Sequence, residues 1–364
     1  MKKIIIICFI KLNPVLEKIL FLNFLKKKYN IYFVFLNYKK MNTKFNYPYE
    51  SENIVQYEFR NQLDFFKWFL INKKNTQTIG IVMHENWKYL LSIMLTKICL
   101  YKSYDIQYKL PFSTPIKNIG LRKKIKKYLS LTKLINKLMI KIVKNFKHKT
   151  FSNSKDSPKN FRLNFFDIEN LLQEKTINKV KKSNYILFLD SHIHEGTDSD
   201  FNGYKTVDKT EHYRKLNIFF ENLEKIMGFD IIISGHPKYK KNYENLFCGR
   251  EIHFNRNKIL IENANYVIGY DSTSIYYAIY MKKKIALINS NEIKALISEN
   301  NNKYYYIENL KNLLNVPCYN ISCSNDDIKD IENYVYDFSY YTKFINNYLY
   351  NKDIDSFKNL INNL

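Results

Sequence analysis

Short runs of apolar residues alternate along the N-terminal half of the chain with segments whose apolar residues recur at helical spacing. The short runs predict buried strands, and the helical spacing predicts the helices between them. This alternation is typical of a parallel sheet that is covered by helices and joined by right-handed crossovers. We expect strands at 3–10, 31–36 and 78–83, a strand end at 101–108, and helices at 14–28, 63–73 and 87–100.

A second alternating block begins at Tyr185 and predicts a second parallel sheet. Beyond Asn291 the pattern is helical and rich in Asn. The predicted fold class is therefore α/β, with two Rossmann-like parallel-sheet domains that face each other across a cleft. In this block the strands are expected at 185–190, 229–234, 251–254, 266–270 and 284–289, and the helices at 210–227, 257–264 and 275–281.

The chain length also suits two domains, because 364 residues exceed what one hydrophobic core ordinarily holds. The segment 151–160 is rich in Ser, Asn and Lys and contains Pro158, a composition typical of a linker. We expect an N-terminal domain at 1–150, a linker at 151–183, a C-terminal domain at 184–325, and helices at 326–364 that pack back on the N-terminal domain.

The net charge of +24 favours an anionic partner, which could be nucleic acid, an anionic membrane surface or a phosphorylated substrate. Much of the basic excess lies in 117–149, where Lys and Arg alternate with apolar residues at helical spacing and no acidic residue occurs. This amphipathic segment is either a solvated surface helix or a patch that binds an anionic membrane. Because no recognisable nucleic-acid-binding motif is present, nucleic acid is not an expected partner.

Cysteine usage and the first apolar run indicate the compartment. The five cysteines are scattered and form no CxxC pair, so neither a zinc site nor a disulfide framework is predicted. The apolar run at 4–10 is short and is followed by Lys11, which favours a buried strand over a secretion signal. No apolar stretch is long enough to span a membrane. We expect a cytoplasmic protein that is peripheral at the inner face of the cytoplasmic membrane.

Ligands of open parallel sheets bind outside the carboxyl ends of the strands, so the loops there form the candidate site. In the second block these loops are 190–203, 235–241 and 271–274. The last of them places three hydroxyl residues at the start of a helix, where backbone N–H groups and hydroxyls bind phosphate or simply cap the helix. The three residues are Ser272, Thr273 and Ser274.

The loop at 235–241 adds a second set of donors at the same edge of the sheet. Pro237 restricts the preceding residue to an extended conformation, which holds the imidazole of His236 at the strand exit. The imidazole N–H and the Lys238 ammonium can both bond phosphate oxygens, and the structural alternative is a capping His beside a solvated Lys. Together the two loops predict a phosphate clamp.

These motifs also resemble a known family. The segment IIISGHPK at 231–238, followed by 266–289, is similar to the C-terminal domain of GT-B glycosyltransferases, and most similar to the bacterial sialyltransferase and polysialyltransferase group. In that group an HP motif and a Ser/Thr-rich motif hold the phosphate and nucleotide of a CMP-activated sugar. By resemblance, His236 and Pro237 take the first role and the hydroxyl residues of 271–274 take the second. The resemblance covers 184–290.

This resemblance implies a glycosyltransferase of bacterial surface-glycan biosynthesis, in capsule or lipopolysaccharide and lipooligosaccharide assembly. The enzyme would transfer a sugar, such as a sialic acid-like sugar, another nonulosonic acid or Kdo, from a CMP-linked donor to a glycan or lipid-linked glycan acceptor. The reaction would be inverting and independent of metal, with no cofactor besides the nucleotide-sugar donor.

One departure from that group concerns the catalytic base. The group carries an acidic motif in its N-terminal domain, and no such tripeptide occurs here before residue 150. A base is still needed because a neutral hydroxyl is a poor nucleophile, and the candidates at predicted strand exits are Asp105 and either Glu85 or His84. In the second block, Asp190 and Glu195 are expected to contact the nucleotide or to act as the catalytic carboxylate.

Two alternatives of different kinds stay open. A phosphate cleft of this type also suits a polyol-phosphate transferase, or a UDP-sugar-dependent GT-B enzyme or epimerase, because those families share a His and a Ser/Thr loop. The net charge leaves a non-enzymatic nucleic-acid-binding protein as the other alternative, whose affinity would depend steeply on salt.

Overall fold

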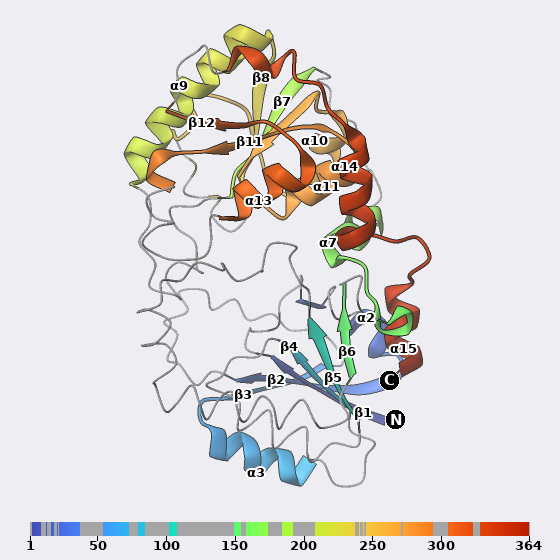
Figure 1. The fold of residues 1–364 in the computed structure, drawn as a ribbon. Helices are drawn as coiled ribbons and strands as arrows, with labels where there is room; N and C mark the ends of the chain where they lie inside the picture. Colours follow the sequence, from blue (N-terminus) through green and yellow to red (C-terminus); the bar gives the residue numbers. More distant parts are fainter. Residues whose placement is uncertain are drawn as a thin grey trace, which may run out of the picture. The chain divides into compact units, whose positions relative to one another are not determined.

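The computed structural model of the chain describes residues 2–8, 12, 16–17, 20, 22–36, 54–72, 79–83, 102–107, 149–153, 158–173, 184–191, 208–236, 240, 243, 245–270, 272–293, 305–322 and 328–363. The chain divides into two compact units. Each is built on one six-stranded sheet, drawn as arrows in Figure 1. Unit 1 comprises Met1–Lys109, Ile116–Phe166 and Lys352–Leu364, and unit 2 comprises Leu110–Pro115 and Asp167–Asn351.

The sheet of unit 1 has the strand order β3-β2-β1-β4-β5-β6, and every neighbouring pair is parallel. The first strand lies in the middle, with the second and third on one side and the others on the opposite side, as in dinucleotide-binding folds. The sequence pattern predicted β1, β2 and β4 but not β3 or β6. It predicted only a strand end where the structure has the full strand β5. The bounds are β1 Lys2–Cys8, β2 Tyr29–Leu36, β3 Ile54–Phe59, β4 Ile79–Met83, β5 Lys102–Gln107 and β6 Lys149–Ser152.

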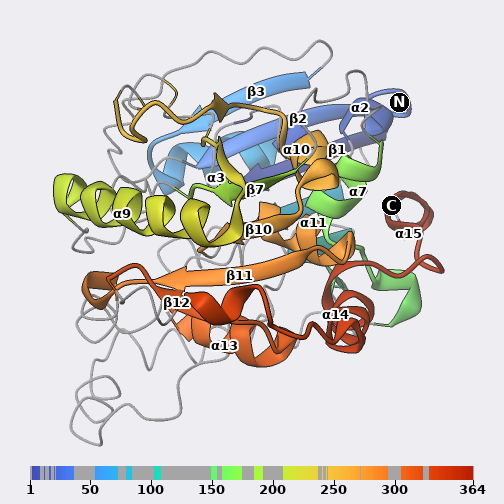
Figure 2. The ribbon, with the colours of Figure 1, turned by 90° about the horizontal axis from the view of Figure 1, so that it is seen from above.

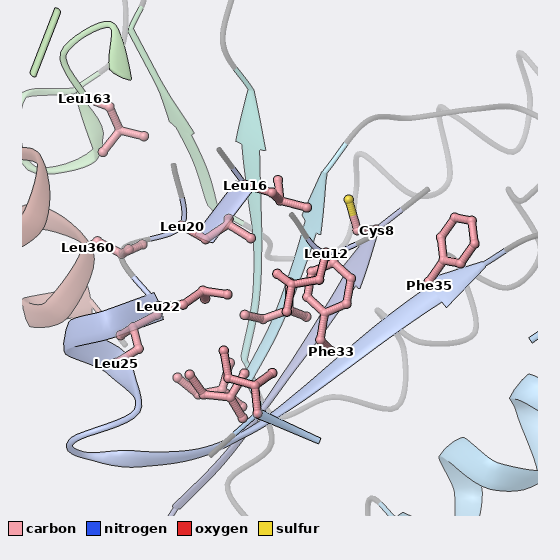
Figure 3. Packing of buried hydrophobic residues seen from close by; sticks show 14 residues of the cluster. Cys8, Leu12, Leu16, Leu20, Leu22, Leu25, Phe33, Phe35, Leu163 and Leu360 are labelled. Atoms are coloured by element: carbon pink, nitrogen blue, oxygen red, sulfur yellow. The ribbon is translucent and has the colours of Figure 1, made fainter. Parts of the chain in front are cut away.

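The core of unit 1 is divided between the two faces of its sheet, because side chains alternate along each strand. Even-numbered positions of β1 face a cluster that includes α2 (Leu22–Leu25) and Leu360 of α15 (Ser356–Asn363), shown in Figure 3. Odd-numbered positions face the opposite cluster, where α3 (Gln62–Asn72) contributes the fully buried Phe65. The apolar run of β1 is continuous for this reason, since both of its faces are covered.

The end of the chain is held in unit 1 by side-chain hydrogen bonds. The backbone N–H of Asn164 donates to the hydroxyl of Ser356 at 2.8 Å, and its side-chain amide donates to the carbonyl of Ile354 at 2.9 Å. The side-chain amide of Asn359 donates to two carbonyls within 159–162. The C-terminal segment is thereby part of the N-terminal unit.

Two segments that the sequence placed between or after the domains contain regular structure. The expected linker 151–183 includes the end of β6 and all of α7 (Phe166–Gln173). The expected helices at 326–364 are divided, with residues up to Asn351 in unit 2 and the rest in unit 1.

The sheet of unit 2 has the order β12-β11-β10-β7-β8-β9 and is also parallel throughout. Its first strand, β7, lies in the middle, so the strand order reverses between β7 and β10. The sequence pattern predicted every strand of this sheet except β12. The bounds are β7 Tyr185–Leu189, β8 Asp230–Ser234, β9 Ile252–His253, β10 Tyr266–Gly269, β11 Lys284–Asn289 and β12 Cys318–Asn320.

Helices cover both faces of this sheet. Phe188 of β7 packs against Phe220 of α9 (Lys209–Met227), with ring centroids 5.0 Å apart. Tyr185, three positions earlier, points to the opposite face and donates a hydrogen bond of 2.6 Å to a carbonyl of α10 (Asn257–Asn263). Figures 1 and 2 accordingly show α9 on one side of the strands of unit 2 and α10 on the other. The remaining helices are α11 Ser274–Tyr280, α13 Tyr305–Leu314 and α14 Phe338–Phe344.

These two sheets confirm the predicted α/β class with two Rossmann-like parallel sheets. The basic segment at 117–148, for which a membrane patch was one expectation, lies outside the described residues. Across the described ranges, no helix combines the length and the apolar character needed to cross a bilayer.

Candidate functional site

The point where the strand order of unit 2 reverses lies between the ends of β7 and β10, and ligands of open α/β sheets bind at such a point. A Cβ atom at Gly269, the last residue of β10, would lie 3.1 Å from the carbonyl oxygen and 3.3 Å from the Cβ of Leu189, the last residue of β7. Glycine therefore lets the two strands come close together where the chain leaves the sheet. The loops that follow define the candidate site.

A side-chain bridge joins two of these loops. The hydroxyl of Ser234, at the end of β8, donates to the Oδ1 atom of Asn257 at 2.5 Å. The Nδ2 atom of Asn257 donates in turn to the hydroxyl oxygen of Ser274, at the start of α11, at 2.6 Å. Asn257 is the first residue of α10. The two loops that the sequence singled out separately are thus connected through one amide.

The hydroxyl loop, which is formed by Ser272, Thr273 and Ser274, still has hydroxyl groups that can donate hydrogen bonds. The Ser274 oxygen accepts from Asn257, and the Ser272 oxygen accepts from the backbone N–H of Ser274 at 3.3 Å. A hydroxyl carries one proton to donate and two lone pairs to accept, and among the described residues neither serine donates its proton. Thr273 is exposed and its side chain does not cap α11. The loop can therefore present hydroxyl donors to an anion.

A carboxyl group that the sequence did not single out lies against this loop. Asp167, in the first turn of α7, is near enough to Thr273 for that side chain to affect its pKa. Burial raises the pKa of Asp167 from its ordinary 3.8 to about 6, and Thr273 partly offsets that rise. The charge of Asp167 therefore changes within about one pH unit of neutrality.

The exit of β8 is fixed by contacts around His236. The backbone N–H of His236 donates to the hydroxyl oxygen of Tyr243 at 2.6 Å. A Cβ atom at Gly235 would lie 2.5 Å from the ring of Phe254, so a side chain here would displace that ring. His236 is half-buried at the carboxyl edge. Pro237 and Lys238, the rest of the predicted motif, lie outside the described residues.

Asp190, which the sequence assigned to nucleotide binding or catalysis, takes part in a buried hydrogen-bond network. Its Oδ2 atom accepts from the hydroxyl of Tyr243 at 2.7 Å and from that of Tyr213 at 3.4 Å. Burial, assisted by the charge of Asp190, raises the pKa of Tyr213, so this phenol keeps its proton and donates. Through Tyr243 the carboxylate also supports the backbone of His236. Asp190 thus braces the edge of the sheet.

A buried histidine faces the same edge from α9. The Nε2 atom of His212 lies 3.2 Å from the hydroxyl oxygen of Tyr270, which directly follows β10. Burial lowers the pKa of His212, although the charges of Asp190 and Glu292 oppose this, so the ring is neutral at pH 7. Within the described part of the chain, its Nδ1 atom is buried without a hydrogen-bond partner. The ring therefore retains one polar atom at the carboxyl edge.

The other predicted site residues lie elsewhere in the chain or outside the described residues. Asp105 lies inside β5, paired with Val82 and Thr150, rather than at a strand exit, because β5 is extended by pairing on both sides. Glu85 and Glu195 lie outside the described residues. Among the residues that are described, no three His, Cys, Asp or Glu side chains are grouped so that they could hold a metal ion.

Four site residues were missed by sequence reasoning. Only Asn257 carried a usable signal, since it begins the helix after a strand exit on the same edge as the predicted loops. The tyrosines are uninformative in a chain with 31 of them. Asp167 precedes the second block, where no strand pattern pointed to it. The missed residues are Asp167, His212, Tyr243 and Asn257.

Comparison with known proteins shows the fold class. No protein-family model matches the chain, and no curated protein matches it. The wall teichoic acid polymerase TagF is similar at 11% identity, over 100% of this chain and 87% of that chain, with a TM-score of 0.52. A variant of that polymerase is similar at 14% identity, over 100% and 87%, with a TM-score of 0.51.

A third solved structure is less similar to this chain than the polymerase is. UDP-GlcNAc 2-epimerase from Neisseria meningitidis, bound to UDP-GlcNAc, has 12% identity over 99% of this chain and 98% of that chain, and its TM-score of 0.46 supports no conclusion. At identities this low the polymerase similarity shows the fold alone. With two sheets of the same strand order, the chain has the GT-B fold of paired Rossmann-like domains.

Proposed function

We propose that this chain is a GT-B glycosyltransferase that transfers a sugar from a nucleotide-activated donor to a glycan acceptor. The observation that supports it most directly is the bridge from Ser234 through Asn257 to Ser274. It joins the strand end that precedes one predicted phosphate-binding loop to the other such loop, beside the strand-order reversal of a Rossmann-like sheet, the place where such sheets bind nucleotides. The GT-B fold is consistent with this activity.

The donor that we propose is CMP-linked, and its sugar is sialic acid-like, another nonulosonic acid or Kdo. This finer assignment rests on the resemblance of the HP and hydroxyl motifs. The acceptor hydroxyl attacks the anomeric carbon with inversion, the bond from that carbon to the phosphate oxygen breaks, and its electron pair leaves on CMP. His236, Lys238 and the hydroxyls of 272–274 would stabilise the charge on the departing phosphate, without a metal.

The proton released by the acceptor requires a base. Asp105 and Glu85 are the groups that we propose for this role, because both belong to the N-terminal unit and a base near neutral pH must reach the attacking hydroxyl. A substitution of the base would lower kcat while leaving the affinity for the nucleotide unchanged, which separates it from the phosphate-binding residues.

The acceptor is proposed to be a surface glycan, capsular or lipopolysaccharide, made at the inner face of the cytoplasmic membrane. The net charge of +24 favours anionic or lipid-linked acceptors held near an anionic surface. The basic segment at 117–149 would supply the peripheral contact. Binding of the protein to anionic vesicles but not to neutral vesicles would test this placement.

A thermal-shift panel of nucleotides tests the proposed donor, because a ligand that binds the folded state raises its apparent stability. Selective stabilisation by CMP, relative to UDP, GDP and CDP, is expected. His236→Ala and Ser272→Ala should reduce CMP affinity in isothermal titration, whereas Ser322→Ala, an exposed serine after β12, should not. Undiminished CMP binding by the first two variants would show that the nucleotide lies elsewhere.

A second candidate is polyol-phosphate transfer, one of the alternatives that the sequence left open. The specific observation in its favour is that a wall teichoic acid polymerase is among the solved structures that match this chain with a TM-score above 0.5. Mass spectrometry of the product separates the two reactions. A product that retains the donor phosphate would exclude glycosyl transfer, and a product that lacks it would exclude phosphate transfer.

A further inference from the structure

We propose that a second ligand site of unit 2 lies beside its edge strand β12 and binds a neutral saccharide. A cavity of about 400 Å³ is lined there by the end of α13, the start of β12 and the segment 328–334. This volume falls within the range of small-molecule sites, which is about 300–1,000 Å³. None of the described residues that line it belongs to the candidate site, which lies where the strand order reverses at β10, two strands away from β12.

The charges of this cavity are balanced, in contrast to those of the chain as a whole. Lys311 and Asp330 are the charged side chains among the described residues that line it, one of each sign, whereas the chain carries a net charge of +24. A phosphate or another anion would meet the carboxylate of Asp330 as well as the ammonium of Lys311, so the cavity gives an anion little net attraction. A neutral ligand that both donates and accepts hydrogen bonds can use both groups.

The other polar side chains of the cavity suit a ligand with apolar faces and a hydroxylated edge. Tyr319 and Tyr334 supply phenol rings, which combine an apolar face with a polar hydroxyl. Asn312 and Asn315 supply amides, each of which donates and accepts hydrogen bonds. A sugar ring has C–H groups on its faces, and the hydroxyls around its edge both donate and accept. This match of chemistry favours a saccharide as the ligand.

Contacts within unit 2 hold the aromatic wall of the cavity in place. The hydroxyl of Tyr334 donates a hydrogen bond of 2.8 Å to the carbonyl of Asn315, the residue that directly follows α13. The Tyr334 ring also packs edge-on against the ring of Tyr336, with centroids 4.9 Å apart. Tyr334 is nevertheless only half-buried, so part of it can contact a ligand. A side chain that is already held in this way loses little freedom on binding.

The place of this site in a reaction rests on the proposed function. An enzyme that extends a glycan holds the reacting end of the acceptor at the donor, and a second saccharide site would hold another unit of the same acceptor. Two linked contacts raise the affinity for a long acceptor without changing that for a short one. The binding of a saccharide beside β12 does not itself depend on which reaction the chain catalyses.

Saturation-transfer NMR with the full-length protein tests the site, with lactose, N,N′-diacetylchitobiose and maltotriose as probes. At least one of them should bind. Its affinity should weaken about tenfold or more in Tyr334→Ala, which removes the aromatic wall, and in Asn312→Trp, which fills the cavity from an exposed position of α13. Tyr340→Ala removes an exposed tyrosine that does not line the cavity, and it should bind the probe as the wild type does.

Thermal unfolding shows whether each variant is folded, so a loss of binding can be separated from a loss of structure. If no probe binds, or if Asn312→Trp binds the probe as tightly as the wild type does, the inference is wrong. It is also wrong if Asn312→Trp abolishes the binding of CMP or sulfate rather than that of a sugar, because the cavity would then hold an anion. If a probe binds here and no nucleotide binds the protein, the proposed function fails and the saccharide site stands.

Discussion

Two carboxyl groups of unit 2 lie at its candidate site in contrasting surroundings. Asp190 is buried and accepts hydrogen bonds from two buried phenols, those of Tyr213 and Tyr243. Asp167 is half-buried, and its side-chain partner is the exposed Thr273. The same chemical group is therefore held by hydrogen bonds from two phenols in one place, whereas in the other its pKa is set mainly by burial.

The difference comes from the donors rather than from the carboxyls. A buried phenol that turned away from Asp190 would give up a buried hydrogen bond, and a buried polar group left without a partner costs about 1–3 kcal/mol. A threonine hydroxyl at the surface loses little by turning, since water or a ligand replaces the bond that it gives up. Sequence position alone assigned Asp190 to the nucleotide or to catalysis, and the described structure adds that its carboxylate accepts hydrogen bonds from two phenols.

The largest expected effect is on the Asp190 network. Asp190→Ala leaves the buried hydroxyls of Tyr213 and Tyr243 without this acceptor, so the free energy of unfolding should fall by about 4 kcal/mol. Urea denaturation measures the change, with the slope as a check on two-state behaviour. Tyr213→Phe should lower the free energy of unfolding less than Tyr243→Phe does. The hydrogen bond from Tyr213 to Asp190 is longer, and Tyr243 also accepts from the backbone N–H of His236. If Asp190→Ala were as stable as the wild type, the Asp190 hydrogen-bond network would not stabilise this edge of the sheet.

The next effect is a pH-dependent one at Asp167. Its folded pKa of about 6 exceeds the ordinary 3.8, so between these values the folded state holds a proton that the unfolded state has lost. The stability of the wild type should therefore fall as pH rises through this window, by at most about 3 kcal/mol. The Asp167→Asn variant should be as stable as the wild type below about pH 4 and more stable than the wild type above about pH 6.

The control for this profile is Ser322→Ala, which removes no ionisable group from an exposed position and should keep the wild-type pH dependence. Unfolding free energies from urea titrations across the window measure both variants. An Asp167→Asn protein that is no more stable than the wild type at neutral pH would show that the carboxyl is not held in a desolvated position.

A smaller effect on stability, with a larger one on binding, is expected at the bridge. Asn257→Ala removes both hydrogen bonds that connect Ser234 to Ser274, which should lower the free energy of unfolding by about 1–2 kcal/mol. Loss of the fixed loop geometry should weaken CMP binding about tenfold or more. Asn263→Ala, in the same helix, removes only an exposed bond to the carbonyl of Ile259 and should leave CMP binding unchanged.

The sequence predicted the interior strands better than the edge strands, for a physical reason. Strands in the middle of a parallel sheet are buried on both faces, so β1 and β7 appear as unbroken apolar runs. The strands that the pattern missed, β3, β6 and β12, all lie at sheet edges. After Ile54 every side chain of β3 is exposed or half-buried, so its sequence shows little of the signal that marks a buried strand.

The candidate site divides in a similar way. Residues directly after a strand, such as His236 and Ser272, could be found from sequence because the carboxyl-edge rule selects strand exits. Their partners could not, since Tyr243 and Asn257 reach the edge from segments whose distance in space no local pattern records. The role of Asp190 depended on which hydroxyls surround it, and the sequence does not encode that directly.

The smallest expected effect concerns His212, and it has the opposite sign to that of Asp167. Burial lowers the pKa of His212 below its ordinary 6.5, so the unfolded state takes up a proton first as pH falls. Stability should therefore decline as pH drops through 6.5, the region where protonation of Asp167 begins to favour the folded state. His212→Gln keeps a polar partner for Tyr270 and should remove this decline, as urea titrations at several pH values would show. If the decline persists in His212→Gln, another group causes it, and the neutral ring is not what opposes Asp167 at low pH.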